Sequence, residues 1–476
     1  MNRKSVYSVG IDIGTTTTQV IFSRLIMVNR APVTQVPRYE FVEREIFYKS
    51  PVRRTPLTSN DQVDVAQIEV FIDEQFTAAN MTLDDIETGA VIITGETSKA
   101  ENARDAVMGL AERLGDFVVA TAGPNLESVI AGHGSGASDY AKQHRARVLN
   151  IDIGGGTSNY AIFDGDNIVD TACLNVAGHL IETDQRGGVT KIHAPAQKVI
   201  EELFGRQMSP AELTMDVLEK ICERMAQLIV ECIDGCRSQL CNDLLMTPAL
   251  GAGRGFDSVF VSGGVGDLFY QLKEQNLDNF QWRDTGVLLA RALLKNAKLA
   301  ALAIKKPGQT LQATVIGAGA YTLSLSGSSI WLRCDQLPLR NVPVVRPVID
   351  WQESNPDVCE QIVHAGQRMD LELRQELYAV AFDSNMPVSY RSVSYAAREL
   401  AEYYHNHGNT QAPAIVITQN DLGKVLGMEL QPLLDTQQLL VIDEVRVREG
   451  DFIDIGQSFF GGEVVPVTIK SLAFPA

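Results

Sequence analysis

The chain carries one short pattern twice. Residues 6–22 read VYSVGIDIGTTTTQVIF, and residues 148–163 read VLNIDIGGGTSNYAIF. Each copy has an apolar run, Asp-Ile-Gly, a turn rich in glycine or threonine, and a second alternating run, which predicts two strands paired as a hairpin. Asp12 and Asp152 are 140 residues apart, a spacing too long for a solenoid repeat. The pattern therefore predicts two similar domains.

The rest of the chain predicts an α/β architecture, because strand-like runs alternate with helical patterns. After the second copy, the turn at Asp164-Gly165 predicts a third strand. From about residue 328 the character changes, with several prolines and then a tail of period-2 alternation, which predicts a further α+β domain. Strands are expected at 90–95, at the start of 117–137 and at 258–264, and helices at about 64–79, 101–114, the remainder of 117–137, 210–235 and 286–303.

Composition limits the partners. The 476 residues include 59 acidic and 41 basic side chains, a formal net charge of −18. Such a field repels phosphate backbones and anionic lipid, which argues against nucleic acid and membrane partners. The amino terminus lacks the apolar run of a secretory signal, and basic residues interrupt the apolar stretch 287–306. Seven cysteines without a CxxC pair predict a reduced, cytosolic-type chain.

The repeated turns have the chemistry of an anion site. Glycines let backbone amides approach an anion closely, and threonine hydroxyls add donors. An aspartate just before such a turn can orient the waters around Mg²⁺. A third glycine-rich element, VSGGVGD at 261–267, follows a strand and would let a helix terminus approach a nucleoside. Each element alone also suits a purely structural turn, but the duplicated pair favours a clamp on a triphosphate–metal complex.

Five segments in this order resemble the actin/Hsp70/sugar-kinase ATPase superfamily: 10–22, 124–137, 149–163, 259–267 and 314–325. The resemblance implies an α/β fold of two related domains with ATP and Mg²⁺ in an interdomain cleft. The implied bounds are 1–145 and 146–312 for the two ATPase domains, 313–328 for a connecting helix that returns between them, and 329–476 for the carboxyl-terminal α+β domain. Asp12 and Asp152 would organise Mg²⁺ through water. The implied cofactor-binding residues are Gly14, Thr15, Thr16, Thr17, Gly154, Gly155, Gly156, Thr157, Gly263, Gly264 and Gly266.

The same resemblance suggests a residue that orients the attacking water. Family members carry an acid or amide nine residues before a glycine on the first connecting helix, and here Glu127 lies nine before Gly136. Its carboxylate could polarise water against the γ-phosphate, so Glu127 joins Asp12 and Asp152 as a candidate catalytic residue. The alternative is a glutamate that only complements the helix dipole.

The whole chain resembles the family of ethanolamine ammonia-lyase reactivating factors. Stretches such as VPRYEF and GGEVVPVTIKSLAFP carry this resemblance, since phosphate binding does not require them. It implies a chaperone that uses ATP and Mg²⁺ to exchange damaged cobalamin for intact adenosylcobalamin on its partner, ethanolamine ammonia-lyase. It also implies a cytoplasmic location. Direct contact with cobalamin, a homodimer and association with a bacterial microcompartment stay open.

Several alternatives stay open beside this interpretation. The same ATP site would serve a small-molecule kinase or a filament-forming actin relative. The cysteines at 222, 232, 236 and 241 match no zinc spacing, and we interpret them as a small apolar face, although an iron–sulfur activator shares the superfamily fold. His133 and His179 are interpreted as structural. Lys470 lacks the setting of a carrier lysine, so the tail is interpreted as a partner-binding or packing domain.

Overall fold

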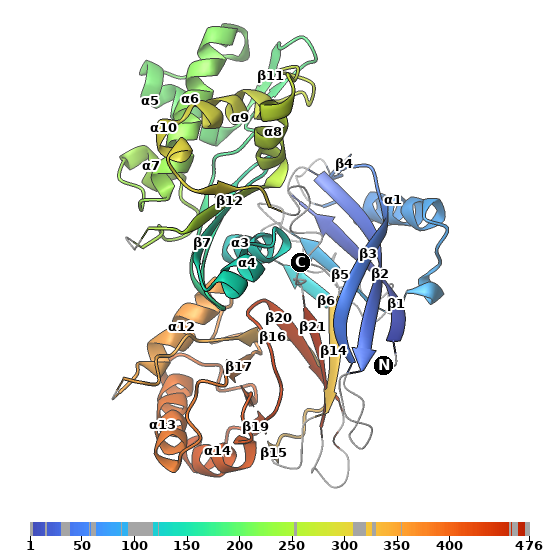
Figure 1. Cartoon of the computed structure of the whole chain (residues 1–476), viewed down its shortest axis with the longest axis vertical. Coiled ribbons are helices and arrows are strands. Elements are labelled where there is room, and N and C mark those ends of the chain that lie inside the picture. Colours follow the sequence, from blue (N-terminus) through green and yellow to red (C-terminus); the bar gives the residue numbers. More distant parts are fainter. Residues whose placement is uncertain are drawn as a thin grey trace.

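A computed structural model gives the fold of the chain. It describes residues 3–14, 17–29, 39–56, 58, 63–86, 88–93, 118–121, 123–251, 255–307, 320–325, 330–353, 355–456, 458 and 465–471. Within them the strands form three large sheets and one two-stranded sheet (Figure 1). None of the helices found there is long and apolar enough to cross a membrane.

The first sheet has the strand order β3-β2-β1-β5-β6, with β4 paired to β2. β1 and β2 form the predicted hairpin, β5 runs parallel to β1, and β6 runs parallel to β5. Alternate residues Val9, Ile11 and Ile13 of β1 pack with helix α1, which begins after the capping side chain of Asp64. The bounds are β1 Arg3–Ile13, β2 Thr17–Asn29, β3 Tyr39–Lys49, β4 Arg53–Arg54, β5 Thr88–Ile93, β6 Val118–Thr121, α1 Val65–Ala78 and a 3₁₀ helix Leu83–Asp85.

The second sheet repeats this order as β9-β8-β7-β12-β13. β7 and β8 form the second hairpin, β9 is the third strand expected after Asp164-Gly165, and β12 runs parallel to β7. Each strand therefore has a counterpart in the first sheet, which confirms the two related α/β units of the actin-like fold. We call the described residues within 3–121 the first unit and those within 123–307 the second unit. The bounds are β7 Arg147–Ile153, β8 Ser158–Asp164, β9 Asn167–Leu174, β12 Ser258–Ser262 and β13 Ile304–Lys305.

The two faces of β7 meet different helices. Leu149, Ile151 and Ile153 enter a large core with helices α6 (Met215–Cys232), α8 (Gly263–Glu274) and α9 (Gly286–Lys295). On the other face, Val148 packs with α3 (Pro124–Gly134) and α4 (Ala137–His144). Gly132 of α3 lies so close to β8 that an added Cβ would meet the Phe163 ring at 2.5 Å. In Figure 1, α3 and α4 lie at the centre of the molecule, between the three sheets.

The helices of the second unit agree broadly with the predicted pattern. The helix expected at 210–235 is α6, with Leu218, Ile221 and Met225 on its buried face, but it begins only at Met215. The single helix expected at 286–303 is two helices, because Asn296 has an extended backbone and its side chain caps the second. The bounds are α5 Ala194–Phe204, a 3₁₀ helix Pro210–Glu212, α6 Met215–Cys232, α7 Gln239–Leu244, α8 Gly263–Glu274, α9 Gly286–Lys295 and α10 Ala297–Ala300, with the two-stranded sheet β10 Ile181–Thr183 and β11 Val189–Ile192.

The third sheet is mixed, with the order β14-β21-β20-β16-β17-β18-β19-β15. Its four central strands, β16 to β19, are parallel and are joined by α12, α13 and α14, which pack on one face of the sheet. We call residues 330–471 the carboxyl-terminal unit. The bounds are β14 Ala320–Leu325, β15 Trp331–Arg333, β16 Leu339–Val345, α12 Val358–Arg368, β17 Ala379–Phe382, α13 Tyr390–Asn406, β18 Ala414–Thr418, α14 Gly423–Leu430, a 3₁₀ helix Gln431–Leu433, β19 Leu439–Ile442, β20 Asp451–Ile455 and β21 Pro466–Ser471.

The connecting helix expected at 313–328 is wrong for residues 320–325. These residues form strand β14, which pairs antiparallel with β21 from Ala320–Ser471 to Leu325–Pro466. The sequence AYTLSL alternates with period 2, which suits a strand, and the partner edge of β21 supplies the hydrogen bonds that a local helix would have made within itself. The other residues of that prediction, and the helix expected at 101–114, lie outside the described residues.

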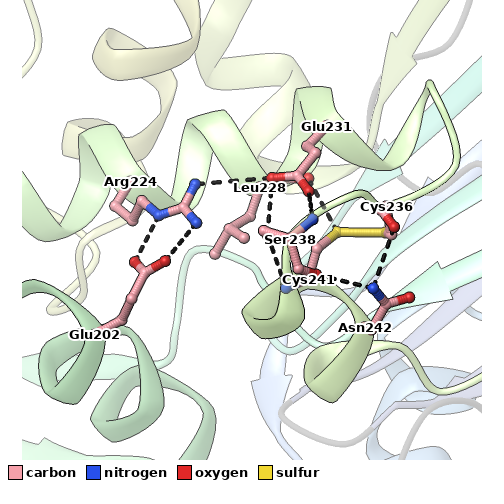
Figure 2. Close-up of polar contacts among 8 residues, drawn as sticks. All are labelled: Glu202, Arg224, Leu228, Glu231, Cys236, Ser238, Cys241 and Asn242. Carbon is pink, nitrogen blue, oxygen red and sulfur yellow. Dashed lines mark hydrogen bonds and ion pairs between the residues drawn. A yellow bond between two sulfur atoms is a disulfide. The ribbon is translucent and has the colours of Figure 1, made fainter.

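The cysteines are not all reduced. Cys236 and Cys241 form a disulfide, while the other five are thiols. The chain turns just after α6, where Gly235 and Cys236 have φ angles of +84° and +44°. The residues between Cys236 and Cys241, which include the start of α7, place the two Cα atoms 5.3 Å apart. Figure 2 shows the disulfide beside Asn242, whose side-chain amide donates to the Cys236 carbonyl at 3.2 Å. Farther away, beyond Glu231, Arg224 Nε and Nη2 contact Glu202 at 2.7 and 2.6 Å. Within the described residues, no group of three or more His, Cys, Asp or Glu side chains is arranged to hold a metal.

Candidate functional site

The turn of the second hairpin is built from backbone contacts. The Gly154 amide donates to the Thr157 carbonyl at 3.0 Å, which closes the turn. The carbonyls of Gly154 and Gly155 accept from the amides of Gly178 and His179 at 3.1 and 2.7 Å. A Cβ added at Gly156 would meet no atom of the described residues within 4 Å. Such a turn can approach a phosphate group without steric hindrance.

Asp152 is the last polar residue of β7 before this turn, and it is buried. Its Oδ2 accepts a 2.6 Å hydrogen bond from the Ser262 hydroxyl on β12, the strand that pairs with β7 on the side away from β8. Burial raises the pKa of Asp152 to about 6, and the hydrogen bond from Ser262 opposes part of this rise. A bound cation would favour the ionised form, so this donor set suits a hydrated Mg²⁺ held largely through water.

The third glycine-rich element brings a helix terminus to the same place. β12 ends at Ser262 and α8 begins at Gly263, whose φ of +85° only glycine adopts readily. A Cβ at residue 263 would lie 2.4 Å from the Ile153 carbonyl oxygen, just before the hairpin turn. By contrast, a Cβ at Gly264 would meet nothing within 4 Å, and one at Gly266 would lie 3.1 Å from the Val261 carbonyl carbon. The positive end of the α8 dipole therefore adjoins the Gly154–Gly156 turn.

The first hairpin turn is held by a different segment. The Thr55 hydroxyl donates to the Gly14 carbonyl at 2.6 Å and lies 3.0 Å from the Thr18 hydroxyl. Thr17 pairs with Arg54 of β4. Asp12 is partly exposed, and its register partners are Gln19 on β2 and Ile92 on β5. Thr15 and Thr16 lie outside the described residues.

A chain of contacts joins the two turns. Arg54, next to Thr55, lies with Nη2 3.4 Å from Oε2 of Glu182 on β10. Glu182 Oε1 is 3.8 Å from His179 Nε2 and 3.0 Å from His193 Nε2, and the His179 amide bonds the Gly155 carbonyl. Burial alone would raise the pKa of Glu182, but the contacts with His193, His179 and Arg54 hold it below its ordinary value. The segments that contact the two hairpins, at Arg54–Thr55 and at His179–Glu182, therefore meet between the two sheets.

Glu127 lies near the end of the second sheet at which Asp152 is found. It lies in the first turn of α3, and its neighbour Ser128 donates to the Ala172 carbonyl at 3.2 Å. Ala172 pairs with Tyr160 of β8, which pairs with Ile151, the residue before Asp152. Because side chains alternate along β7, Asp152 shares with Val148 the face on which α3 packs.

A buried hydrogen-bond network strengthens this connection. The Ser135 hydroxyl, at the end of α3, donates to Asn150 Oδ1 at 2.8 Å. The Asn150 amide donates to Ser262 Oγ at 3.2 Å, and Ser262 in turn donates to Asp152. Asp152 and the helix that carries Glu127 are therefore parts of one packed unit.

Sequence reasoning missed several residues that build the site. Ser262 lies inside the glycine-rich motif, but nothing in the motif indicates that its hydroxyl has a role. Its position beside Asp152 follows from the register of β12 against β7. Arg54 and Glu182 meet only through tertiary structure. His179 is a satisfied side chain between Asp284 at 3.2 Å and Glu182, in agreement with its interpretation as structural. Burial lowers the pKa of His133 to about 3, so its ring is neutral.

Comparisons with known proteins give the family. The sequence profile described as "Ethanolamine utilisation protein EutA" matches residues 4–475. The proteins named ethanolamine ammonia-lyase reactivase EutA from Escherichia coli and Salmonella typhimurium are 50% and 48% identical over 476 residues, covering all of this chain and all of each relative. A solved Ppx/GppA phosphatase from Aquifex aeolicus aligns with 65% of this chain and 98% of its own, at 13% identity and a TM-score of 0.38. The chain belongs to the EutA family of ethanolamine utilisation proteins.

Proposed function

We propose that this protein is an ATP-dependent reactivase of adenosylcobalamin-dependent ethanolamine ammonia-lyase. In this proposal it releases damaged cobalamin from the lyase so that intact adenosylcobalamin can bind. The observation that carries the nucleotide part is the contact chain from Gly14 through Thr55, Arg54, Glu182 and His179 to Gly155. The partner is inferred from the names of the two full-length relatives.

Each part of the site has a role in this proposal. The glycine turns and the first turn of α8 would hold the phosphates through backbone amides, as an anion nest does. Asp12 and Asp152 would hold Mg²⁺ through its water shell, and the metal would neutralise charge on the phosphates. Glu127 would orient the water that attacks the γ-phosphate. The site residues would thus bind the phosphates, position Mg²⁺ and orient the attacking water, which is most of what phosphoryl transfer requires.

Hydrolysis can be coupled to the partner only through conformation. ATP must bind one arrangement of the two units more tightly than another, and the lyase must distinguish between the same arrangements. Arg54 and Glu182 belong to different sheets, so their contact changes whenever the first and second units move apart. Closure around ATP would in this way alter the affinity for the lyase and open its cofactor pocket.

The direct test is a reactivation assay. Pure protein is incubated with hydroxocobalamin-inactivated lyase, Mg²⁺, free adenosylcobalamin and ATP, and lyase activity is followed. We expect activity to return with ATP and to remain absent without nucleotide or with Asp152→Ala. Asp164→Ala is the matched control, because Asp164 lies at the far end of β8, paired with Arg147. No recovery with the wild-type protein would refute the proposed reaction.

Two further arms distinguish the related functions. Phosphorylated product from a small-molecule screen would indicate a kinase, and ATP-dependent sedimentation would indicate a filament. We also infer that the protein is cytoplasmic. The proposal leaves open whether it contacts cobalamin, forms a homodimer or associates with a bacterial microcompartment. Pull-down of the lyase with and without ATP tests the partner itself, and loss of binding in either nucleotide state shows which state the lyase recognises.

A further inference from the structure

The carboxyl-terminal unit reaches into the first turn of α3. Asp370 follows α12, and its Oδ2 accepts a 2.7 Å hydrogen bond from the backbone amide of Leu126. Its Oδ1 accepts from the Asn125 side chain at 3.0 Å, and the same Asn125 amide group contacts the Gln367 carbonyl at 3.3 Å. Both partners are in the turn that holds Glu127. The carboxylate therefore caps a helix that belongs to another unit of the protein.

Helix α3 has no cap of its own. Its N-cap residue is Gly123, and no side chain from within the helix start caps it. The first amides of a helix lack intrahelical partners, so an external carboxylate satisfies one of them and complements the helix dipole. Asp370 supplies this carboxylate from about 240 residues away.

Both sides of this contact are shaped for close approach. A Cβ at Gly123 would lie 2.5 Å from Asp370 Cγ, so a larger residue there would displace the carboxylate. Asp370 itself has a φ of +54°, a conformation that asparagine and aspartate tolerate better than other side chains. Two residues earlier, Arg368 Nε donates to Glu449 at 2.6 Å in a buried ion pair, which anchors the end of α12. The position of Asp370 is thus fixed within its own unit.

The other side of the same turn is attached to the second sheet. Asn125 Oδ1 accepts from the Thr171 hydroxyl of β9 at 3.0 Å, and Ser128 donates to the Ala172 carbonyl. The first turn of α3 is therefore held between the carboxyl-terminal unit and the sheet that contains Asp152. A shift of the carboxyl-terminal unit would change the contacts of this turn with Asp370 and leave its contacts with β9 in place.

We infer that Asp370 is a positioning residue for Glu127, through which the carboxyl-terminal unit controls ATP hydrolysis. This inference rests on the proposed function, because it assigns a regulator to the same site. Movement of the unit when a partner binds would withdraw the cap, loosen the first turn of α3 and turn the Glu127 carboxylate from its water. The carboxyl-terminal unit would then act as a switch for hydrolysis rather than as a passive attachment.

The test compares capping variants on the full-length protein. Asp370→Ala removes the acceptor, while Asp370→Asn keeps a side-chain oxygen and tolerates the positive φ. Asp357→Ala is the matched control, because Asp357 caps α12 through the Glu360 amide at 2.9 Å and lies at the opposite end of that helix from Asp370. The readouts are kcat and KM for ATP, the Kd of a fluorescent ATP analogue, and hydrogen exchange of peptides covering 124–131.

We expect Asp370→Ala to lower kcat about tenfold while Kd changes about twofold or less, because orientation and not binding is lost. Hydrogen exchange of 124–131 should accelerate in Asp370→Ala. Asp370→Asn should restore part of both properties, because its oxygen can accept from the Leu126 amide while its NH2 group faces the Asn125 donor. A kcat for Asp370→Ala equal to that of Asp357→Ala, or unchanged exchange at 124–131, would overturn the inference. Failure of the wild type to hydrolyse ATP would instead refute the proposed function, and the exchange data would still decide whether Asp370 caps α3.

Discussion

The two related sheets share one strand order, but they hold their aspartates in different surroundings. Asp152 is buried, and its register partners Asn159 and Ser262 both carry polar side chains. Asp12 occupies the same place in β1, yet it is partly exposed and lies opposite Gln19 and Ile92. The turn after Asp152 is fixed by the Gly178–His179 segment, and the turn after Asp12 by Thr55.

For the proposed site, this difference predicts a division of work between Asp152 and Asp12. A buried carboxylate with a hydroxyl partner is held in one orientation before any ligand binds, which favours transition-state stabilisation. A partly exposed carboxylate can adjust to a metal that keeps its waters. The duplicated topology thus sets where each aspartate lies, while neighbouring residues set how each one behaves.

The largest expected effect comes from removing these carboxylates. We expect Asp152→Ala to lower the rate of ATP hydrolysis by about 10³-fold and Asp12→Ala by about 10²-fold, because the preorganised group contributes more to charge stabilisation. Single-turnover hydrolysis with saturating ATP and Mg²⁺ measures both. Asp164→Ala, an exposed position on β8, should remain close to wild type. Equal losses at Asp12 and Asp152 would break the proposed division of work, and no loss at either would remove the site.

A second prediction concerns the glycine that joins α8 to the second sheet. Gly263→Ala should lower the free energy of unfolding by about 2–4 kcal/mol, since its φ is +85° and the new Cβ would meet the Ile153 carbonyl at 2.4 Å. Gly264→Ala is the matched control, with open space around the Cβ and a gain of up to about 1 kcal/mol in helix propensity. Thermal unfolding of the two variants measures the difference. A stable Gly263→Ala protein would show that α8 can move away from the turn.

More of the fold than of the candidate site could be predicted from the sequence. The two Asp-Ile-Gly patterns predicted the hairpins correctly, because the alternation of apolar residues and the turn residues are local signals. The 313–328 helix failed at β14, because its pairing partner β21 lies about 145 residues later and leaves no local trace. Ser262, Arg54 and Asp370 act through register or tertiary contact, so spacing within the sequence could not identify them. The Cys236–Cys241 pair likewise depends on the path of the short segment between them, where α7 begins after Ser238.

The third prediction concerns a buried carboxyl group in the carboxyl-terminal unit, outside the two related sheets. Asp443 follows β19, is fully buried, accepts from the Gly423 amide at 3.1 Å, and has an Oδ1 with no hydrogen-bond partner. Burial raises its pKa to about 6, above the value of about 4 expected for the unfolded chain. The folded protein therefore binds the proton more tightly, and this group makes stability fall as the pH rises from about 4 to about 6.

Asp443→Asn should accordingly stabilise the protein at pH 7.5 by on the order of 1–3 kcal/mol, and the gain should vanish near pH 4. Unfolding followed at several pH values measures it. At pH 7.5 without nucleotide, Asp152→Asn should also stabilise the protein, whereas the partly exposed Asp12→Asn should gain less. A gain at Asp443 without one at Asp152 would mean that the Ser262 hydrogen bond already offsets the burial of Asp152.

The smallest expected effect lies in the contact between the halves. Arg54 is 69% exposed and its partner Glu182 16%, so Arg54→Ala should change the free energy of unfolding by about 0.5 kcal/mol or less. Arg53→Ala is the neighbouring control, since Arg53 pairs with Glu74 inside the first unit, at 3.3 Å. If closure of the two units accompanies ATP binding, only Arg54→Ala should weaken ATP affinity, by about twofold to threefold at low salt. An ionic strength of about 1 M should abolish this difference, because the Debye length is then about 3 Å and the interaction between exposed charges is screened. Equal effects of both variants would assign the change to lost positive charge near the first turn, and the Arg54–Glu182 contact would then have no specific role in closure.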